Sequence, residues 1–179
     1  MSRDVTGTRF ERLVMPHLDA AYTLARYLIN DPSEVEDVLQ EAVLRGVQYF
    51  NTLEHDNNAR AWFLTIVRRE CYTAWSRRDG RMDSVSLETM SDIEDVAISP
   101  EQTAERSLLR ERIVHAVGQL PGHLREVVVL RELQQLSYEE IAAITESPIG
   151  TVMSRISRAR TRLADSLRDL VDVDVGEMS

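Results

Sequence analysis

Residues 137–163, SYEEIAAITESPIGTVMSRISRARTRL, decide the fold of the second half of the chain. Ser137 with Glu140 three residues later forms a capping box, which predicts the start of a short helix. Residues 145–147 follow as a turn, and the Ser147-Pro148 pair has the N-cap and first-turn chemistry of a longer helix. A short helix, a tight turn and a longer helix predict a helix-turn-helix motif.

The longer helix of this motif has two distinct faces when its residues are placed at about 100° intervals. The apolar face, expected to pack on the core, comprises Val152, Ile156, Ala159, Leu163 and Leu167. The opposite face is polar and basic and comprises Thr151, Ser154, Arg155, Arg158, Thr161 and Arg162. Arginine forks on an outward helix face suit the major groove of duplex DNA. The alternative is a solvated basic face on an ordinary bundle helix, but the preceding capped helix and turn favour DNA binding.

The rest of the chain is also predicted to be helical, because its apolar residues recur at helical spacing without sustained two-residue alternation. Asp31, Pro32 and Glu34 have the order of a helix start. Residues 51–58 are expected to form a loop. The helices are expected at about residues 10–30 (one helix or a pair), 31–50, 60–78, 101–119, 121–134, 137–144 and 148–169.

Two helical domains are expected, one over residues 1–81 and one over residues 104–170. Residues 82–103 form the linker between them, and seven acidic residues and no basic residue lie between Met82 and Glu105. Residues 171–179 form an acidic tail that is expected to fray. The predicted fold is therefore all-α, with two small helical domains joined by a flexible acidic linker.

The net charge of −9 argues against nucleic-acid binding until the distribution of charge is considered. All 21 basic residues are arginine; six lie between Arg60 and Arg81, and five lie between Thr151 and Arg168. A bias in genomic base composition would explain the absence of lysine without any functional cause. Where the arginines cluster, however, they offer planar forks for phosphates and guanine edges.

The remaining composition favours a cytoplasmic protein that is not an enzyme. Cys71 is the single cysteine, lies on the predicted core stripe of its helix, and is expected to be an inert buried thiol. No apolar run reaches the ~20 residues of a membrane span, and the N-terminus has no signal-peptide pattern. The four histidines lack metal-ligand spacing, and there is no phosphate-binding glycine loop. No metal, cofactor or catalytic residue is therefore expected.

A resemblance to a known family extends these inferences. Residues 125–163 contain REV-VLRE, LSYEEIA, P-GTV-SR and RAR, and this run resembles region 4 of bacterial sigma factors, the promoter-specificity subunits of RNA polymerase. The resemblance implies that residues 149–163 read the −35 element of a promoter. The residues that would contact it are Thr151, Met153, Ser154, Arg155, Arg158 and Arg162. Two positions depart from the family pattern: Glu146 replaces the usual glycine of the turn, and Met153 replaces a residue that is often basic.

The helix predicted from Asp31 carries an exposed leucine, Leu44, within an acidic face. Such a face suits protein docking, although a single exposed leucine is weak evidence alone. The run EVEDVLQEAVLRGVQYF, residues 34–50, is similar to sigma region 2.2, which binds the clamp helices of the largest polymerase subunit. The resemblance implies that Asp37, Gln40, Glu41 and Leu44 contact core polymerase.

The next predicted helix interleaves arginines with aromatic residues, a pattern that suits single-stranded DNA. Its sequence ARAWFLTIVRRECYTAWSRR, residues 59–78, is similar to sigma regions 2.3 and 2.4, which melt the −10 element and hold an unstacked base. Trp62 is expected to pack in the core, and Trp75 is left open between core packing and DNA. At Arg69 the family commonly has asparagine. The residues implied in −10 binding are His55, Asp56, Asn57, Asn58, Arg68, Arg69, Tyr72, Ser76, Arg77 and Arg78.

Only regions 2 and 4 are recognisable, which is the minimal plan of the extracytoplasmic-function (ECF) sigma factors of the sigma-70 family. The resemblance implies as partners core RNA polymerase, through its clamp helices and flap region, promoter DNA and an anti-sigma factor, without membrane insertion. It also implies that the acidic linker passes near the polymerase active site and the RNA exit path, although the linker could equally be a soluble tether. The alternatives are a stand-alone helix-turn-helix regulator and an interaction adaptor such as an anti-sigma protein.

Overall fold

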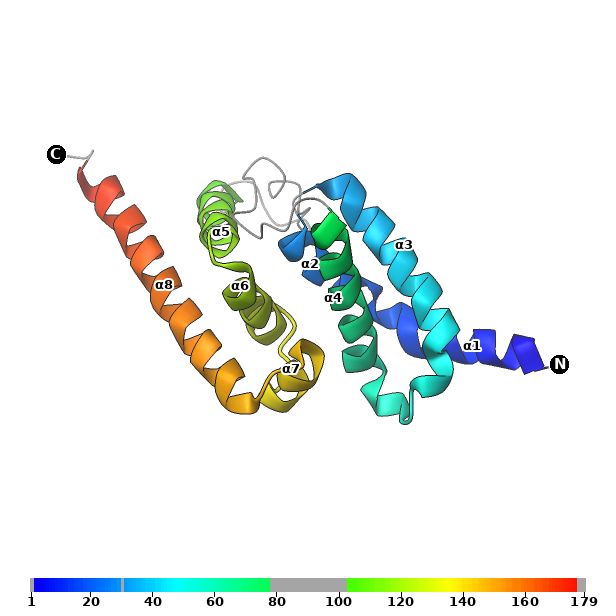
Figure 1. Ribbon diagram of the computed structural model, residues 1–179. Coiled ribbons are helices and arrows are strands. Elements are labelled where there is room, and N and C mark those ends of the chain that lie inside the picture. Colours follow the sequence, from blue (N-terminus) through cyan, green and yellow to red (C-terminus); the bar gives the residue numbers. More distant parts are fainter. Residues whose placement is uncertain (1, 30, 78–102, 177–179) are drawn as a thin grey trace.

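The computed structural model describes residues 2–29, 31–77 and 103–176, and all regular structure in these ranges is helical (Figure 1). This confirms the all-α prediction. The part of the predicted linker from residue 82 to residue 102 lies outside the described residues, as does Arg78.

The first half of the chain forms a bundle of four α-helices. Its elements are α1 (Ser2–Val14), a 3-10 turn (Met15–His17), α2 (Leu18–Leu28), α3 (Pro32–Tyr49), two further 3-10 turns (Phe50–Thr52 and Asp56–Asn58) and α4 (Ala59–Arg77). The turn containing Pro16 separates α1 from α2, so the segment predicted as one helix or a pair is a pair. The Asp31 carboxylate accepts a hydrogen bond from the Ser33 amide at 3.0 Å, which confirms the predicted cap of α3.

The second half contains the helix-turn-helix. Its elements are α5 (Thr103–Gly118), α6 (Gly122–Val128), a π-helical turn (Val129–Leu133), α7 (Tyr138–Thr145) and α8 (Ile149–Gly176). The capping box is confirmed, because the Glu140 amide donates to Ser137 Oγ at 3.1 Å and the Ser137 amide donates to the Glu140 carboxylate at 2.7 Å.

Two predictions about α8 are corrected. The helix begins at Ile149, one residue later than predicted, and the Ser147 hydroxyl donates to the Thr145 carbonyl at 3.1 Å within the turn. The helix also continues to Gly176 instead of fraying at residue 171. Neither glycine nor proline occurs between residues 164 and 175, so nothing in the backbone chemistry ends the helix earlier.

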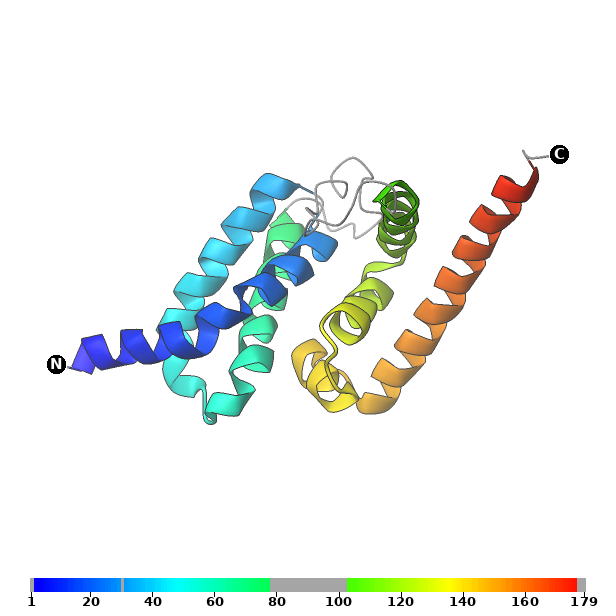
Figure 2. The ribbon, with the colours of Figure 1, turned by 180° about the vertical axis from the view of Figure 1, so that it is seen from behind.

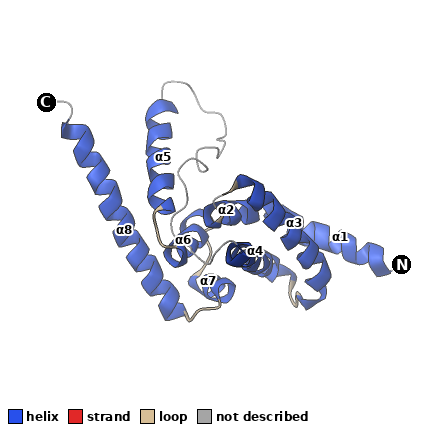
Figure 3. Cartoon of the chain, turned by 45° about the horizontal axis from the view of Figure 1, so that its top comes forward, coloured by secondary structure: helices blue, strands red, loops and turns tan. Residues whose placement is uncertain are grey.

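The two halves pack directly against each other. Helices α6 and α7 lie between α8 and the first half, as seen from behind in Figure 2 and from above in Figure 3. One continuous core includes Leu24 of α2, Leu64 of α4, Val127 of α6 and Ile141 of α7, all fully buried. The sequence pattern predicted each apolar face but not that the faces of the two halves meet in a shared core.

Candidate nucleic-acid interface

The basic face of α8 is open to solvent. Val152, Ile156 and Ala159 are buried beneath it, which confirms the predicted core stripe at these positions. Among the residues implied in −35 contact, Met153, Ser154, Arg158 and Arg162 are exposed, whereas Thr151 and Arg155 are half-buried. The first turns of this helix can therefore approach a DNA groove without any rearrangement of the motif.

Arg155 is tied to the turn of the motif. Its guanidinium donates to Ser147 Oγ at 3.3 Å, so it supports the turn from the recognition helix. His123 on α6 lies near the arginines of this face. Burial lowers the pKa of His123, and the positive charges of Arg155 and Arg162 lower it further. Arg158 and Arg162, both exposed on this face, offer positive charge to DNA phosphate despite the negative net charge of the chain.

The turn between α7 and α8 requires a left-handed residue, and Glu146 adopts that conformation with φ 52° and ψ 40°. The Ser147 amide donates to the Ala142 carbonyl at 3.1 Å, as in the usual helix C-terminal motif. Glycine adopts this conformation without the Cβ clash that a residue such as glutamate has to accept. The departure noted at Glu146 is therefore a real backbone cost of this turn.

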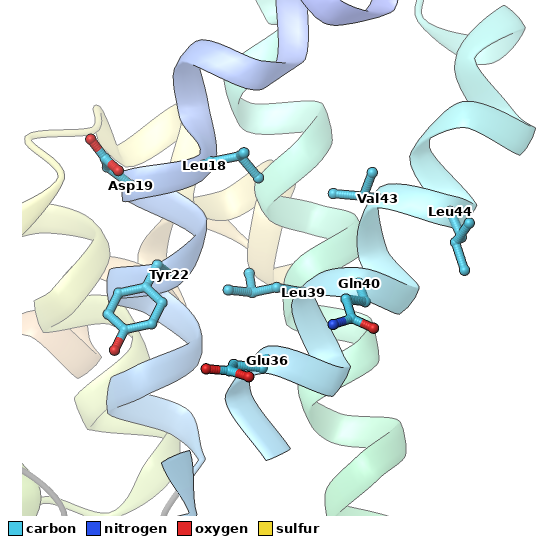
Figure 4. Close-up of a pocket in the computed structure, with 8 residues that line it drawn as sticks. All are labelled: Leu18, Asp19, Tyr22, Glu36, Leu39, Gln40, Val43 and Leu44. Atoms are coloured by element: carbon cyan, nitrogen blue, oxygen red, sulfur yellow. The ribbon is translucent and has the colours of Figure 1, made fainter. Parts of the chain in front are cut away.

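The acidic face of α3 is also exposed. Asp37, Gln40, Glu41 and Leu44 all face solvent, and the Leu44 side chain is 65% exposed. Next to them lies a groove of about 670 Å³ between α2 and α3. In Figure 4, Leu18, Leu39 and Val43 point into this groove, and Leu44 lies at its outer edge. An apolar groove bordered by acidic and amide side chains has the composition of a protein-docking surface.

An ion-pair network fixes α3 to α4 beneath this face. The Arg45 guanidinium lies 3.0 Å from Glu41 and 2.8 Å from Glu70, and Glu70 is buried between the helices. Cys71 beside it is buried, which confirms the core position predicted from its stripe, and burial raises the pKa of its thiol. Trp62 packs on the core and donates from its indole to Thr52 Oγ1 at 3.2 Å, so its predicted core role is confirmed.

The loop implied in holding an unstacked base is exposed at all four predicted positions. They are His55, Asp56, Asn57 and Asn58. The carboxylate of Asp56 pairs with Arg9 of α1, and Arg9 also lies over the ring of Phe50, 5.2 Å from its centroid. The loop is thereby attached to the N-terminal helix while its amide side chains remain at the surface.

The outward face of α4 is only partly open to solvent, because the second half of the chain covers Arg68 and Tyr72. The Arg68 guanidinium binds the Glu126 carboxylate of α6 through two contacts, at 2.9 Å and 3.3 Å. The Tyr72 hydroxyl donates to the same carboxylate at 2.9 Å. Arg68 also lies over the ring of Tyr72, 4.6 Å from its centroid. Glu126 is only 1% exposed, so this is a buried and fully paired carboxylate.

A second contact joins α4 to the turn of the helix-turn-helix motif. Arg69 pairs with Glu146, the left-handed residue of that turn, and Figure 1 shows α7 beside α4. Ser76 and Arg77, nearer the end of α4, are exposed. Of the residues implied in −10 binding, Arg68, Arg69 and Tyr72 thus contact the second half of the chain.

Sequence reasoning missed the residues that join the halves. Arg125 is buried and donates to the carbonyls of Tyr27 at 3.1 Å and of Gly118 and Leu120, both at 2.8 Å. Burial lowers its pKa to about 10, which still leaves it charged at neutral pH. Arg60 donates to the Gln134 backbone and side-chain carbonyls, both at 2.8 Å. No local signal marks the contacts between the halves, because Tyr27 and Gln134 lie far along the chain from Arg125 and Arg60.

Within the described ranges, no group of three or more His, Cys, Asp or Glu side chains is arranged to hold a metal ion. In the same ranges, every helix is too short or too polar to cross a lipid bilayer.

Comparison with known proteins agrees with this geometry. Residues 13–81 match the family model described as sigma-70 region 2, and residues 110–163 match that described as sigma-70, region 4. The RNA polymerase sigma-H factor of Pseudomonas aeruginosa is 33% identical over 90% of this chain and 88% of its own length. The ECF RNA polymerase sigma-E factor of Escherichia coli is 33% identical over 84% of this chain and 82% of its own length.

Solved structures with a similar fold align with most of the chain, and two of them are described here. The sigma factor RpoE of Bartonella quintana, solved in complex with the anti-sigma factor NepR, aligns with a TM-score of 0.70 at 31% identity, covering 89% of this chain and 96% of that one. CnrH, solved in complex with the cytosolic domain of CnrY, aligns with a TM-score of 0.63 at 25% identity, covering 92% and 88%. The chain belongs to the sigma-70 family of RNA polymerase sigma factors and is of the ECF type.

Proposed function

We propose that this sigma factor binds core RNA polymerase through α3 and reads a two-part promoter through α4 and α8. The observation that carries the proposal is the presence, on one short chain, of an exposed acidic docking face and two arginine-bearing helix faces. A stand-alone helix-turn-helix regulator would need only the arginine-bearing face of α8. The chain then acts as an initiation factor in the cytoplasm and has no catalytic centre of its own.

The docking face on α3 is assigned to the clamp helices of the largest polymerase subunit, with the flap region as a second contact for the other half. Asp37, Gln40, Glu41 and Leu44 would make the first contact, since they combine charge with an exposed apolar side chain. Residues 1–81 would form the unit that binds core and the −10 element. Residues 104–170 would form the unit that binds the −35 element, and the linker 82–103 would join them.

The DNA contacts are assigned by the chemistry of each face. On α8, Ser154 and Arg158 are exposed and can reach base edges and phosphates, and Arg162 extends the same face. On α4, arginines beside Tyr72 suit a single strand whose bases stack and whose phosphates pair. His55, Asp56, Asn57 and Asn58 would form the wall of the pocket for an unstacked base.

We also propose an anti-sigma partner. RpoE of Bartonella quintana was solved with the anti-sigma factor NepR, and CnrH was solved with the cytosolic domain of CnrY. Both structures align over most of this chain. The apolar groove beside Leu39 and Val43 adjoins the proposed core-binding face. A protein seated there would therefore exclude core polymerase.

The core-binding assignment is tested by a pull-down of purified core polymerase with variants of the full chain. Asp37→Arg should lower core binding at least tenfold, because it places a cation in an acidic docking face. Glu11→Arg makes the same change of charge at an exposed position on α1 and should leave binding near the native level. Circular dichroism checks that both variants fold, and equal binding of the two would refute the assignment.

A further inference from the structure

The first turns of α8 carry two exposed apolar side chains beside its basic face. Ile149 is 42% exposed and Met153 is 51% exposed, and no other large apolar side chain described on α8 is exposed. Residues four apart lie on the same side of a helix, so the two side chains are neighbours. One exposed apolar residue is ordinary on a protein surface, but an adjacent pair beside a DNA-binding face offers a contact of its own.

We propose that Ile149 and Met153 form an apolar reader for the 5-methyl group of thymine in the −35 element. The proposal rests on the proposed function, because it assumes that α8 enters the major groove of that element. It deepens the function by naming a feature of the bases that this chain selects. The two side chains thereby determine part of the promoter specificity, beside the arginines that contact phosphates and base edges.

The chemistry of the major groove points to thymine. The base edges there present hydrogen-bond donors and acceptors and one apolar group, which is the methyl of thymine. Isoleucine has no hydrogen-bonding group in its side chain, and the thioether of methionine is only a weak acceptor. The two side chains therefore have little to offer guanine, adenine or cytosine. A basic side chain in place of Met153 would instead suit the O6 and N7 acceptors of guanine.

The place of the pair on α8 suits contact with bases. In a helix-turn-helix the second helix contacts base edges through its N-terminal residues, and Ile149 is the first residue of α8. A Cβ added at Gly150 would meet nothing within 4 Å apart from its chain neighbours and the helix backbone, so DNA can approach closely there. Ser154 and Arg158 are exposed as well and remain available for hydrogen bonds. The apolar pair therefore lies where α8 first meets the base edges.

The first test selects promoters from a library randomised over the −35 region, with holoenzyme assembled from the full chain and purified core polymerase. The unmodified chain should enrich a T·A pair at one position or more of that region. Met153→Arg should replace one of these pairs by a G·C pair, because the arginine fork binds guanine O6 and N7. Met153 is exposed, so the change leaves the buried stripe of α8 intact. Identical selections by the two proteins would overturn the proposal.

The second test removes only the methyl groups. The selected duplex is prepared with deoxyuridine in place of every thymidine of the −35 region, and the affinity of the holoenzyme for each duplex is measured. The unmodified chain should bind the uracil duplex about three- to fivefold less tightly, as expected for the loss of one buried methyl group. Met153→Ala should bind the thymine duplex more weakly than the unmodified chain does, and it should bind the two duplexes nearly equally.

Leu108→Ala is the matched control. Leu108 is 54% exposed, close to the value for Met153, but it lies on α5. This variant should keep the full difference in affinity between the thymine and uracil duplexes. The control shows that the difference does not come from exposed apolar side chains in general or from an effect of uracil on the duplex itself. Circular dichroism checks that all variants fold.

Arg158→Ala separates failure of this proposal from failure of the proposed function. It should weaken binding to both duplexes by the same factor. Equal binding of the two duplexes by the unmodified chain, with the loss in Arg158→Ala retained, would overturn the methyl reader and leave the assignment of α8 intact. A difference that persists when Ile149 and Met153 are both replaced by alanine would also overturn the reader. Selection of no −35 sequence, together with no loss in Arg158→Ala, would overturn the assignment of α8 and the reader with it.

Discussion

Single residues in the second half carry backbone costs that the fold tolerates. Glu146 and Gln135 are the described non-glycine residues with positive φ, at 52° and 56°. The sequence predicted difficulty at Glu146, because glycine is usual at that place in the motif. Nothing marked Gln135, since the π-helical turn before it was not foreseen from spacing that suited an ordinary helix.

Gln135→Gly should stabilise the protein. Glycine adopts φ 56° without the Cβ clash, and the gain should be about 0.5–1 kcal/mol after the extra entropy of the unfolded chain is subtracted. The free energy of unfolding in urea measures it. Gln119→Gly, at an exposed position without positive φ, is the control and should not stabilise. A loss of stability in Gln135→Gly would show that its side chain outweighs the backbone cost.

The helices of this protein were easier to predict from the sequence than the contacts between them, because the signals for helices are local. Asp31 and Ser137 each cap the helix that the sequence assigned to them, and both caps are seen as hydrogen bonds. The buried stripe of α8 also followed from helical spacing. Helix ends that no capping residue marks were predicted less accurately. The end of α8 was expected at about residue 169, but the helix continues to Gly176.

Ser137→Ala should destabilise the second half by about 1 kcal/mol, because it removes the acceptor for the Glu140 amide at the start of α7. Ser137→Thr keeps a hydroxyl in that place and should cost much less. Urea unfolding of the two variants gives the comparison. Equal losses in both would indicate that shape at this position matters more than the cap.

The whole molecule depends on contacts that no local pattern contains. Periodicity placed Arg69 and Tyr72 on the outward face of α4 and Arg68 near its rim, and it placed Glu126 within a predicted helix. It could not show that they meet, since they are far apart in sequence and belong to different halves. The residues of the candidate site were therefore predictable, whereas their partners were not.

The shared core predicts cooperative unfolding of the two halves. Both tryptophans lie in the first half, so their fluorescence follows that half, whereas far-ultraviolet circular dichroism follows helices throughout the chain. The two probes should give coincident urea transitions, because Val127 and Ile141 of the second half are buried in the same core as Leu64. A dichroism transition in two steps, with fluorescence following only one of them, would show that the halves unfold separately.

The central claim is that this chain directs core polymerase to a two-part promoter. Run-off transcription tests it most directly, with purified core polymerase, with and without the protein, on genomic fragments that include the promoter of its own gene. We predict a specific transcript that requires the protein and that weakens when Arg155 and Arg158 are replaced by alanine while core binding is retained. Failure to produce any specific transcript, together with failure to bind core polymerase, would contradict the claim.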